Sequence, residues 1–148
     1  MEEFSIIGDN GNYIKITFKE VYGFPESTCH WGGYELRATL EIKSGNFQVK
    51  SIFWTSTGEI YEFYKKLEAC NEELKGSVAF TNYETNLEFN VKYDNMGHVN
   101  IEGRFYELNE LDNELKFEFN SDQSYISMTV EELKQIALKY GDMKGVKK

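Results

Sequence analysis

The chain is poor in the residue types that most often form cross-links, interrupt helices and strands, or take part in catalysis. Its 148 residues include one proline, 12 glycines, two cysteines and two histidines. Cys29 and Cys70 lack the Cys-x-x-Cys spacing, so no disulfide framework or zinc site is predicted. The composition excludes a collagen-like or disordered chain. No run of 18 apolar residues is available to span a membrane, and Met1 to Phe4 lacks the positive start of a secretory signal, so we expect a cytoplasmic protein without a membrane partner.

The apolar content, in contrast, is high enough to build a core without staples. Hydrophobic residues make up 41% of the chain and aromatic residues 16%. A chain of this length buries about two thirds of its surface on folding. We therefore expect one domain over residues 1–143, followed by a basic tail over residues 144–148 that carries three lysines.

Charge of one sign dominates. Sixteen lysines and arginines stand against 25 acidic residues, for a net charge of −9. Because nucleic-acid affinity comes mainly from basic groups that displace counterions, direct nucleic-acid binding is not expected. The same field would accelerate the encounter with a basic protein. Simple solubility is the alternative explanation of this charge.

The hydrophobic pattern predicts an α+β fold. Alternating residues predict strands over residues 4–7, 13–21, 35–43 and 47–55, and a second strand series from Val78 to Phe119. Capping boxes at Ser56 and Glu59, and at Thr129 and Glu132, predict the starts of two helices, the first of which ends at Gly76. Strands with one apolar face need a cover. We expect a twisted antiparallel sheet of seven or eight strands, in the order ββββαββββα, with both helices packed on one face.

No pattern in the sequence points to catalysis. Neither His30 nor His98 stands in a nucleophile, phosphate-binding or metalloprotease motif. We therefore predict a protein that is not an enzyme and has no catalytic residues, no metal and no cofactor. A hydrolase with paired carboxylates is a further class, and it would require a cleft in which two acids face one another. A small-molecule-binding module is the other alternative, with a pocket between the sheet and its helices among the many aromatic side chains.

The acidic residues concentrate in one segment. Residues 102–122 hold seven acids against Arg104 and Lys116, a net charge of −5. A solvated hairpin would explain this, but the segment also suits docking of a cationic protein. Trp31 and Tyr34 stand near the end of a loop, where rigid rings can anchor an interface. The predicted contact residues are Glu102, Arg104, Glu107, Glu110, Asp112 and Glu114, with Trp31 and Tyr34 as aromatic anchors.

Several motifs in order give the chain a family resemblance. They are Ile7-Gly8-Asp9-Asn10-Gly11 before a strand, Trp31 before the strand from Leu36 to Ile42, Gly97-His98-Val99-Asn100-Ile101-Glu102-Gly103, and Leu115-Lys116-Phe117-Glu118-Phe119 running into Asp122-Gln123-Ser124-Tyr125. This pattern resembles the WapI-type immunity proteins of bacteria. The resemblance implies a cytoplasmic protein that neutralises the C-terminal toxin domain of an Rhs-like polymorphic toxin by stoichiometric binding. Such toxins are often nucleases, so we expect a basic toxin domain as the partner of an acidic surface.

Overall fold

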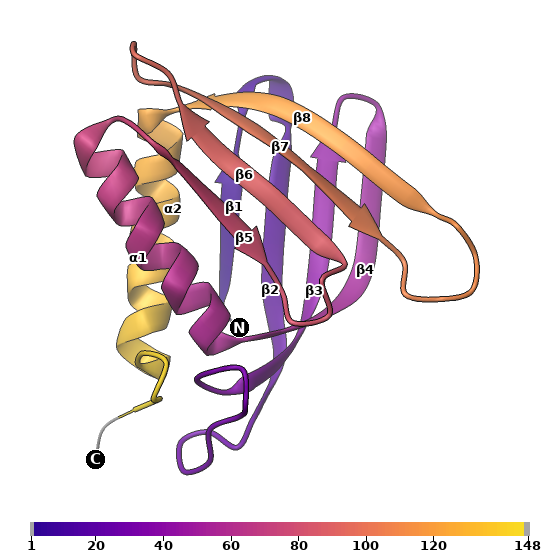
Figure 1. Ribbon diagram of the computed structural model, residues 1–148, viewed down its shortest axis with the longest axis vertical. Coiled ribbons are helices and arrows are strands. Elements are labelled where there is room, and N and C mark those ends of the chain that lie inside the picture. The colour runs from indigo at the N-terminus through magenta and orange to yellow at the C-terminus, as the bar shows by residue number, and fades with distance from the viewer. Residues whose placement is uncertain (1, 147–148) are drawn as a thin grey trace.

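The computed structural model describes residues 2–146, and in this range the secondary-structure elements follow the predicted order (Figure 1). The elements are β1 (Glu3–Ile7), the short 3-10 turn η1 (Asp9–Gly11), β2 (Tyr13–Tyr22), β3 (Glu35–Ser44), β4 (Phe47–Ser56), α1 (Thr57–Glu73), β5 (Ser77–Thr81), β6 (Leu87–Tyr93), β7 (His98–Tyr106), β8 (Glu114–Asp122) and α2 (Gln123–Tyr140). The prediction of an α+β fold with order ββββαββββα is confirmed.

The strands form two antiparallel sheets of four, where the sequence analysis expected a single sheet. One sheet has the order β1-β2-β3-β4 and the other β5-β6-β7-β8, so each strand pairs only with its neighbours in sequence. The sheets lie one in front of the other in Figure 1, and both helices lie side by side along one flank. Two sheets with one apolar face each can bury those faces against one another, which is why eight strands need not join edge to edge.

The core lies between the sheets and the helices. Inward positions alternate with exposed ones, as in β3, where Leu36, Ala38, Leu40 and Ile42 are buried. Phe53 of the first sheet lies 6.3 Å from Phe80 of the second, measured between ring centroids. The Phe63 ring on α1 meets Phe80 edge-on at 5.6 Å. Burial of these apolar side chains is the main favourable contribution to folding.

Helix α1 begins as predicted and ends earlier than predicted. The Ser56 side chain accepts a hydrogen bond from the Glu59 backbone N–H at 3.1 Å, which confirms this residue as the N-cap. The helix ends at Glu73, and its C-cap is Leu74 in the left-handed conformation (φ 55°). The prediction that Gly76 caps the helix is therefore wrong. Gly76 also has positive φ, at 91°, but it lies in the connection to β5.

Helix α2 begins six residues before the predicted start. Asp122 is its N-cap and accepts from the Tyr125 backbone N–H at 3.0 Å, whereas Thr129 lies inside the helix. The Thr129 hydroxyl donates to the Ser5 carbonyl at 2.6 Å, and the Glu132 carboxylate accepts from the Ser5 N–H at 3.0 Å. The capping-box residues therefore bind strand β1 and do not cap their own helix.

The end of the described chain packs onto the body. The tail predicted over residues 144–148 lies partly outside the described residues, since 147 and 148 are not among them. The Val146 N–H donates to the Tyr34 hydroxyl at 2.9 Å. Residue 146 is thus attached to the loop between β2 and β3.

Candidate functional site

The connection between β7 and β8 is an exposed loop of residues 107–113, which we call the acidic loop. It presents the carboxylates of Glu107, Glu110 and Asp112 to solvent. Leu108 and Leu111 on the same loop are 51% and 65% exposed. The loop is closed by a backbone hydrogen bond from the Glu107 N–H to the Asn113 carbonyl at 3.1 Å. It therefore offers acidic and apolar groups together on one projection.

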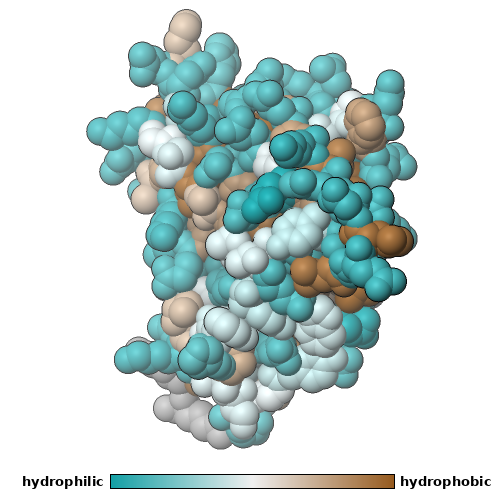
Figure 2. Space-filling model, turned by 45° about the vertical axis from the view of Figure 1, so that its right-hand side comes forward, coloured by the Kyte–Doolittle hydropathy of each residue, from teal (hydrophilic) through white to brown (hydrophobic). Residues whose placement is uncertain are grey.

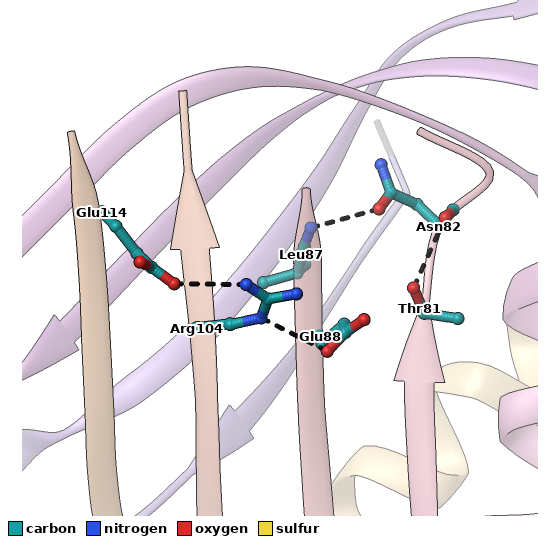
Figure 3. Close-up of polar contacts among 6 residues, drawn as sticks. All are labelled: Thr81, Asn82, Leu87, Glu88, Arg104 and Glu114. Carbon is teal, nitrogen blue, oxygen red and sulfur yellow. Dashed lines mark hydrogen bonds and ion pairs between the residues drawn. The ribbon is translucent and has the colours of Figure 1, made fainter. Parts of the chain in front are cut away.

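Arg104 on β7 bridges the neighbouring strands β6 and β8 on the outer face of the second sheet. Its Nε lies 3.4 Å from a Glu88 oxygen and its Nη1 lies 3.4 Å from a Glu114 oxygen, so the guanidinium sits between two carboxylates (Figure 3). Hydrogen bonding to Glu88 and then to Glu114 raises the pKa of Arg104 above its usual range. All three side chains are partly exposed, so the pairs add little stability. The Arg104 ion pairs offset the charge of Glu88 or Glu114. They do not offset the charges of Glu107, Glu110 and Asp112.

Four of the predicted acidic residues keep uncompensated charge. None of the ion pairs formed within residues 2–146 includes one of them, and they are Glu102, Glu107, Glu110 and Asp112. Glu102 on β7 also stands directly opposite Glu118 on β8. Like charges facing each other across a strand pair are destabilising. A cationic partner would relieve this repulsion.

Glu102 and Glu118 border a shallow hollow of about 500 Å³ on the outer face of the second sheet. Both carboxylates are exposed to solvent, and Glu118 accepts a hydrogen bond from the Asn100 amide at 2.9 Å. A glycoside hydrolase needs its two acids in a cleft that shapes the substrate. An open sheet face does not supply that shape.

The structure separates the two predicted aromatic anchors. Trp31 is 44% exposed and stacks on Tyr83, with ring centroids 4.9 Å apart and ring planes 3° from parallel. Tyr34 is fully buried. Its hydroxyl donates to the Pro25 carbonyl at 2.8 Å and accepts from the Val146 N–H. Tyr34 is therefore a core residue, and the prediction that it anchors a partner is wrong.

Sequence reasoning missed three aromatic residues that share the Trp31 surface. Together they form what we call the aromatic patch, which consists of Tyr22, Trp31, Trp54 and Tyr83. Tyr22 stacks on Trp54 at 5.9 Å, and the Tyr83 hydroxyl donates to Glu35 at 3.0 Å. Desolvation, followed by the bond to Glu35, raises the pKa of Tyr83 above its usual range. Trp54 stands out of phase with buried Phe53, and this alternation was the available signal.

Two buried asparagines hold the aromatic patch and the acidic loop in fixed relation. The Asn82 amide nitrogen donates to the Trp54 carbonyl and to the Asn86 side chain, both at 2.8 Å. The Asn86 amide nitrogen donates to the Tyr106 carbonyl, one residue before the acidic loop, at 3.3 Å. These bonds link the strand that carries Trp54 to the residue that precedes the acidic loop. The face of the molecule seen in Figure 2 is mainly hydrophilic, with scattered apolar side chains.

A groove of about 450 Å³ lies between the first half of β4 and the start of β8. Phe47, Val49 and Lys50 form one wall. Phe105, Glu107 and Leu115 belong to the other. Apolar and polar side chains thus line the groove together, and it borders the acidic loop.

Residues 5–141 match the model of the Immunity protein WapI-like family. The chain belongs to this family of immunity proteins. No curated protein and no solved structure matches it. Membership in the family implies a toxin protein as partner.

The remaining features of the described chain offer little for other functions. The hollow between α1 and α2, lined by Ile60, Tyr64 and Leu133 among others, has no room for a small molecule. Residues 2–146 contain no cluster of three or more side chains able to hold a metal ion. None of the helices described is long and apolar enough to cross a membrane.

Proposed function

We propose that this protein neutralises a cognate toxin domain by binding it through the acidic loop and the neighbouring strand β7, without catalysing a reaction. The observation that carries the proposal is the placement of uncompensated carboxylates beside exposed leucines, in a chain that belongs to an immunity protein family. Charged groups steer encounter and exclude wrong partners, whereas apolar groups supply desolvated contact area. The acidic loop offers both.

The proposed partner is a basic domain, and a nuclease is the class that suits it. A nuclease must hold phosphates with lysines and arginines. Glu102, Glu107, Glu110 and Asp112 can occupy the same cationic groups. Trp31 and Tyr83 offer flat, rigid rings on which an arginine can stack. Occupation of the phosphate-binding surface would block substrate.

Co-expression tests the proposal directly. The toxin domain encoded immediately upstream is expressed alone and together with this protein. We expect growth to be restored by co-expression, and the two purified proteins to elute as one complex in gel filtration. Failure to restore growth together with separate elution would refute the proposed function.

Charge reversal tests the surface. Glu107, Glu110 and Asp112 are changed together to lysine, and association with the toxin domain is followed by stopped flow at several salt concentrations. We expect the association rate at low salt to fall at least about tenfold and its salt dependence to flatten, because steering is lost. Reversal of three exposed α1 acids, Glu62, Glu72 and Glu73, changes the net charge equally and should have a much smaller effect. Equal effects of the two triple variants would place the interface elsewhere.

A further inference from the structure

Within residues 2–146, other parts of the chain contact three of the four sheet edges. The backbone of Ser5 on β1 is bound by Thr129 and Glu132 of α2. Strand β5 packs against α1. The second half of β8 crosses the β3–β4 turn, where the Ser44 hydroxyl donates to the Glu118 carbonyl at 3.2 Å. Contacts of this kind hinder pairing with a strand from another protein at the residues that make them.

Strand β4 is the edge strand of the first sheet that lies opposite β1 in the strand order. Gly45 and Asn46 form a two-residue turn with Ser44 opposite Phe47, and Gly45 has the positive φ (62°) that such a turn needs at its first position. In this register the N–H and C=O groups of residues 47, 49 and 51 point to β3, and those of residues 48, 50 and 52 point outward. The outward Trp54 carbonyl, which accepts from Asn82, follows the same alternation.

The outward groups from residue 48 to residue 52 form what we call the β4 edge. Among residues 2–146, the one hydrogen bond to this edge comes from the neighbouring Ser51 hydroxyl to the Ile52 carbonyl, at 3.1 Å. The N–H groups of Gln48, Lys50 and Ile52 have no acceptor in that range. Ile52 and Phe47 are 51% and 66% exposed. A strand with these properties can accept another strand.

We propose that the β4 edge pairs with an extended segment of the toxin domain, which thereby becomes a fifth strand of the first sheet. This proposal rests on the proposed function and names how the partner is held. Every second side chain of the segment would enter the groove between β4 and β8, where apolar side chains would meet Val49 and Leu115 and a lysine or arginine would reach Glu107.

Charge favours this occupant over a second copy of the chain. Each copy carries a net charge of −9, and pairing of two β4 edges would bring two acidic loops toward one another. Lys50 on the β4 edge also discourages self-pairing, as lysines on edge strands commonly do. A cationic segment, in contrast, would be attracted by Glu107, which lines the groove.

A proline substitution separates backbone pairing from side-chain contact. Lys50→Pro removes the outward N–H and leaves the β3–β4 hydrogen bonds in place, a position at which edge strands tolerate proline. Lys50→Ala removes the same side chain and keeps the N–H. With the upstream-encoded toxin domain, we expect Lys50→Pro to weaken binding at least about tenfold relative to Lys50→Ala. Equal affinities of two folded variants would overturn the proposal and leave the proposed function intact.

Hydrogen exchange on the unmodified protein covers the case in which Lys50→Pro does not fold. We expect the amides of Gln48, Lys50 and Ile52 to exchange at least about tenfold more slowly in the toxin complex than in the free protein. Unchanged exchange at all three amides in a formed complex would refute strand pairing. In the free protein, these amides could instead exchange slowly at high concentration and faster on dilution, with a dimer seen in sedimentation. That result would identify a second copy as the occupant and also overturn the proposal. Absence of any toxin complex would instead contradict the proposed function.

Discussion

Asn82→Ala should destabilise the fold more than its position in a loop suggests. Asn82 is 1% exposed and lies between β5 and β6. Its side chain makes three hydrogen bonds, to the Trp54 carbonyl, to the Asn86 side chain and from the Leu87 N–H at 3.2 Å (Figure 3 shows the last). Alanine removes all three and leaves their partners without replacements.

The size of the effect follows from these bonds. A partner left unsatisfied in the interior costs about 1 to 3 kcal/mol. Taking about 1 kcal/mol for each of three partners, because relaxation and water entry recover part of the loss, we expect the free energy of unfolding to fall by about 3 kcal/mol. For a domain of this size the midpoint of thermal unfolding should drop by about 6 to 12 °C.

Urea unfolding followed by circular dichroism measures this difference. Asn90→Ala is the matched control, because Asn90 is an exposed residue of β6 and the substitution is the same. We expect the control to change the free energy of unfolding by less than about 0.5 kcal/mol. A loss below about 1 kcal/mol for Asn82→Ala would show that the asparagine network does not hold the two surfaces together.

Three further substitutions probe other contacts. Burial raises the pKa of the Glu132 carboxyl above its ordinary value, so the free energy of unfolding falls as pH rises through the pKa of the folded state. Glu132→Gln keeps an acceptor for the Ser5 N–H but does not ionise. The difference in unfolding free energy between this variant and the unmodified protein should therefore favour the variant more at pH 7 than at about pH 4. Urea midpoints at both pH values measure this difference. Tyr34→Phe should cost about 1 to 2 kcal/mol by the same method, because two hydrogen bonds are lost; no loss would contradict its role in the core. Trp31→Ala should weaken toxin binding at least about tenfold in calorimetry while altering stability by less than about 1 kcal/mol, and unchanged affinity would remove Trp31 from the interface.

The candidate surface could be predicted only in part, and the residues show why. Glu107, Glu110 and Asp112 lie close together in the sequence, so the acidic character of this loop could be predicted without a structure. Trp31 and Tyr34 look alike in sequence, yet one is 44% exposed and the other fully buried. Their difference arises because Tyr34 contacts Pro25 and Val146, and residue 146 lies far away along the chain.

Local patterns determined the order of the strands and helices, and which side of each strand is apolar. Alternation and the Ser56 cap act over a few residues, so the order ββββαββββα and the start of α1 followed from the sequence alone. The acidic character of the β7–β8 loop also followed from the sequence alone.

Tertiary structure decided how those elements meet. A period of two specifies a buried face but not the sheet to which a strand belongs, so the division into two sheets was not visible. Thr129 and Glu132 fit a helix start, yet their side chains bind Ser5, more than 120 residues away along the chain. These contacts lie on the β1 edge, whereas the N–H groups of Gln48, Lys50 and Ile52 on the β4 edge have no acceptor within residues 2–146. Hydrogen bonds between distant segments depend on packing and not on sequence spacing.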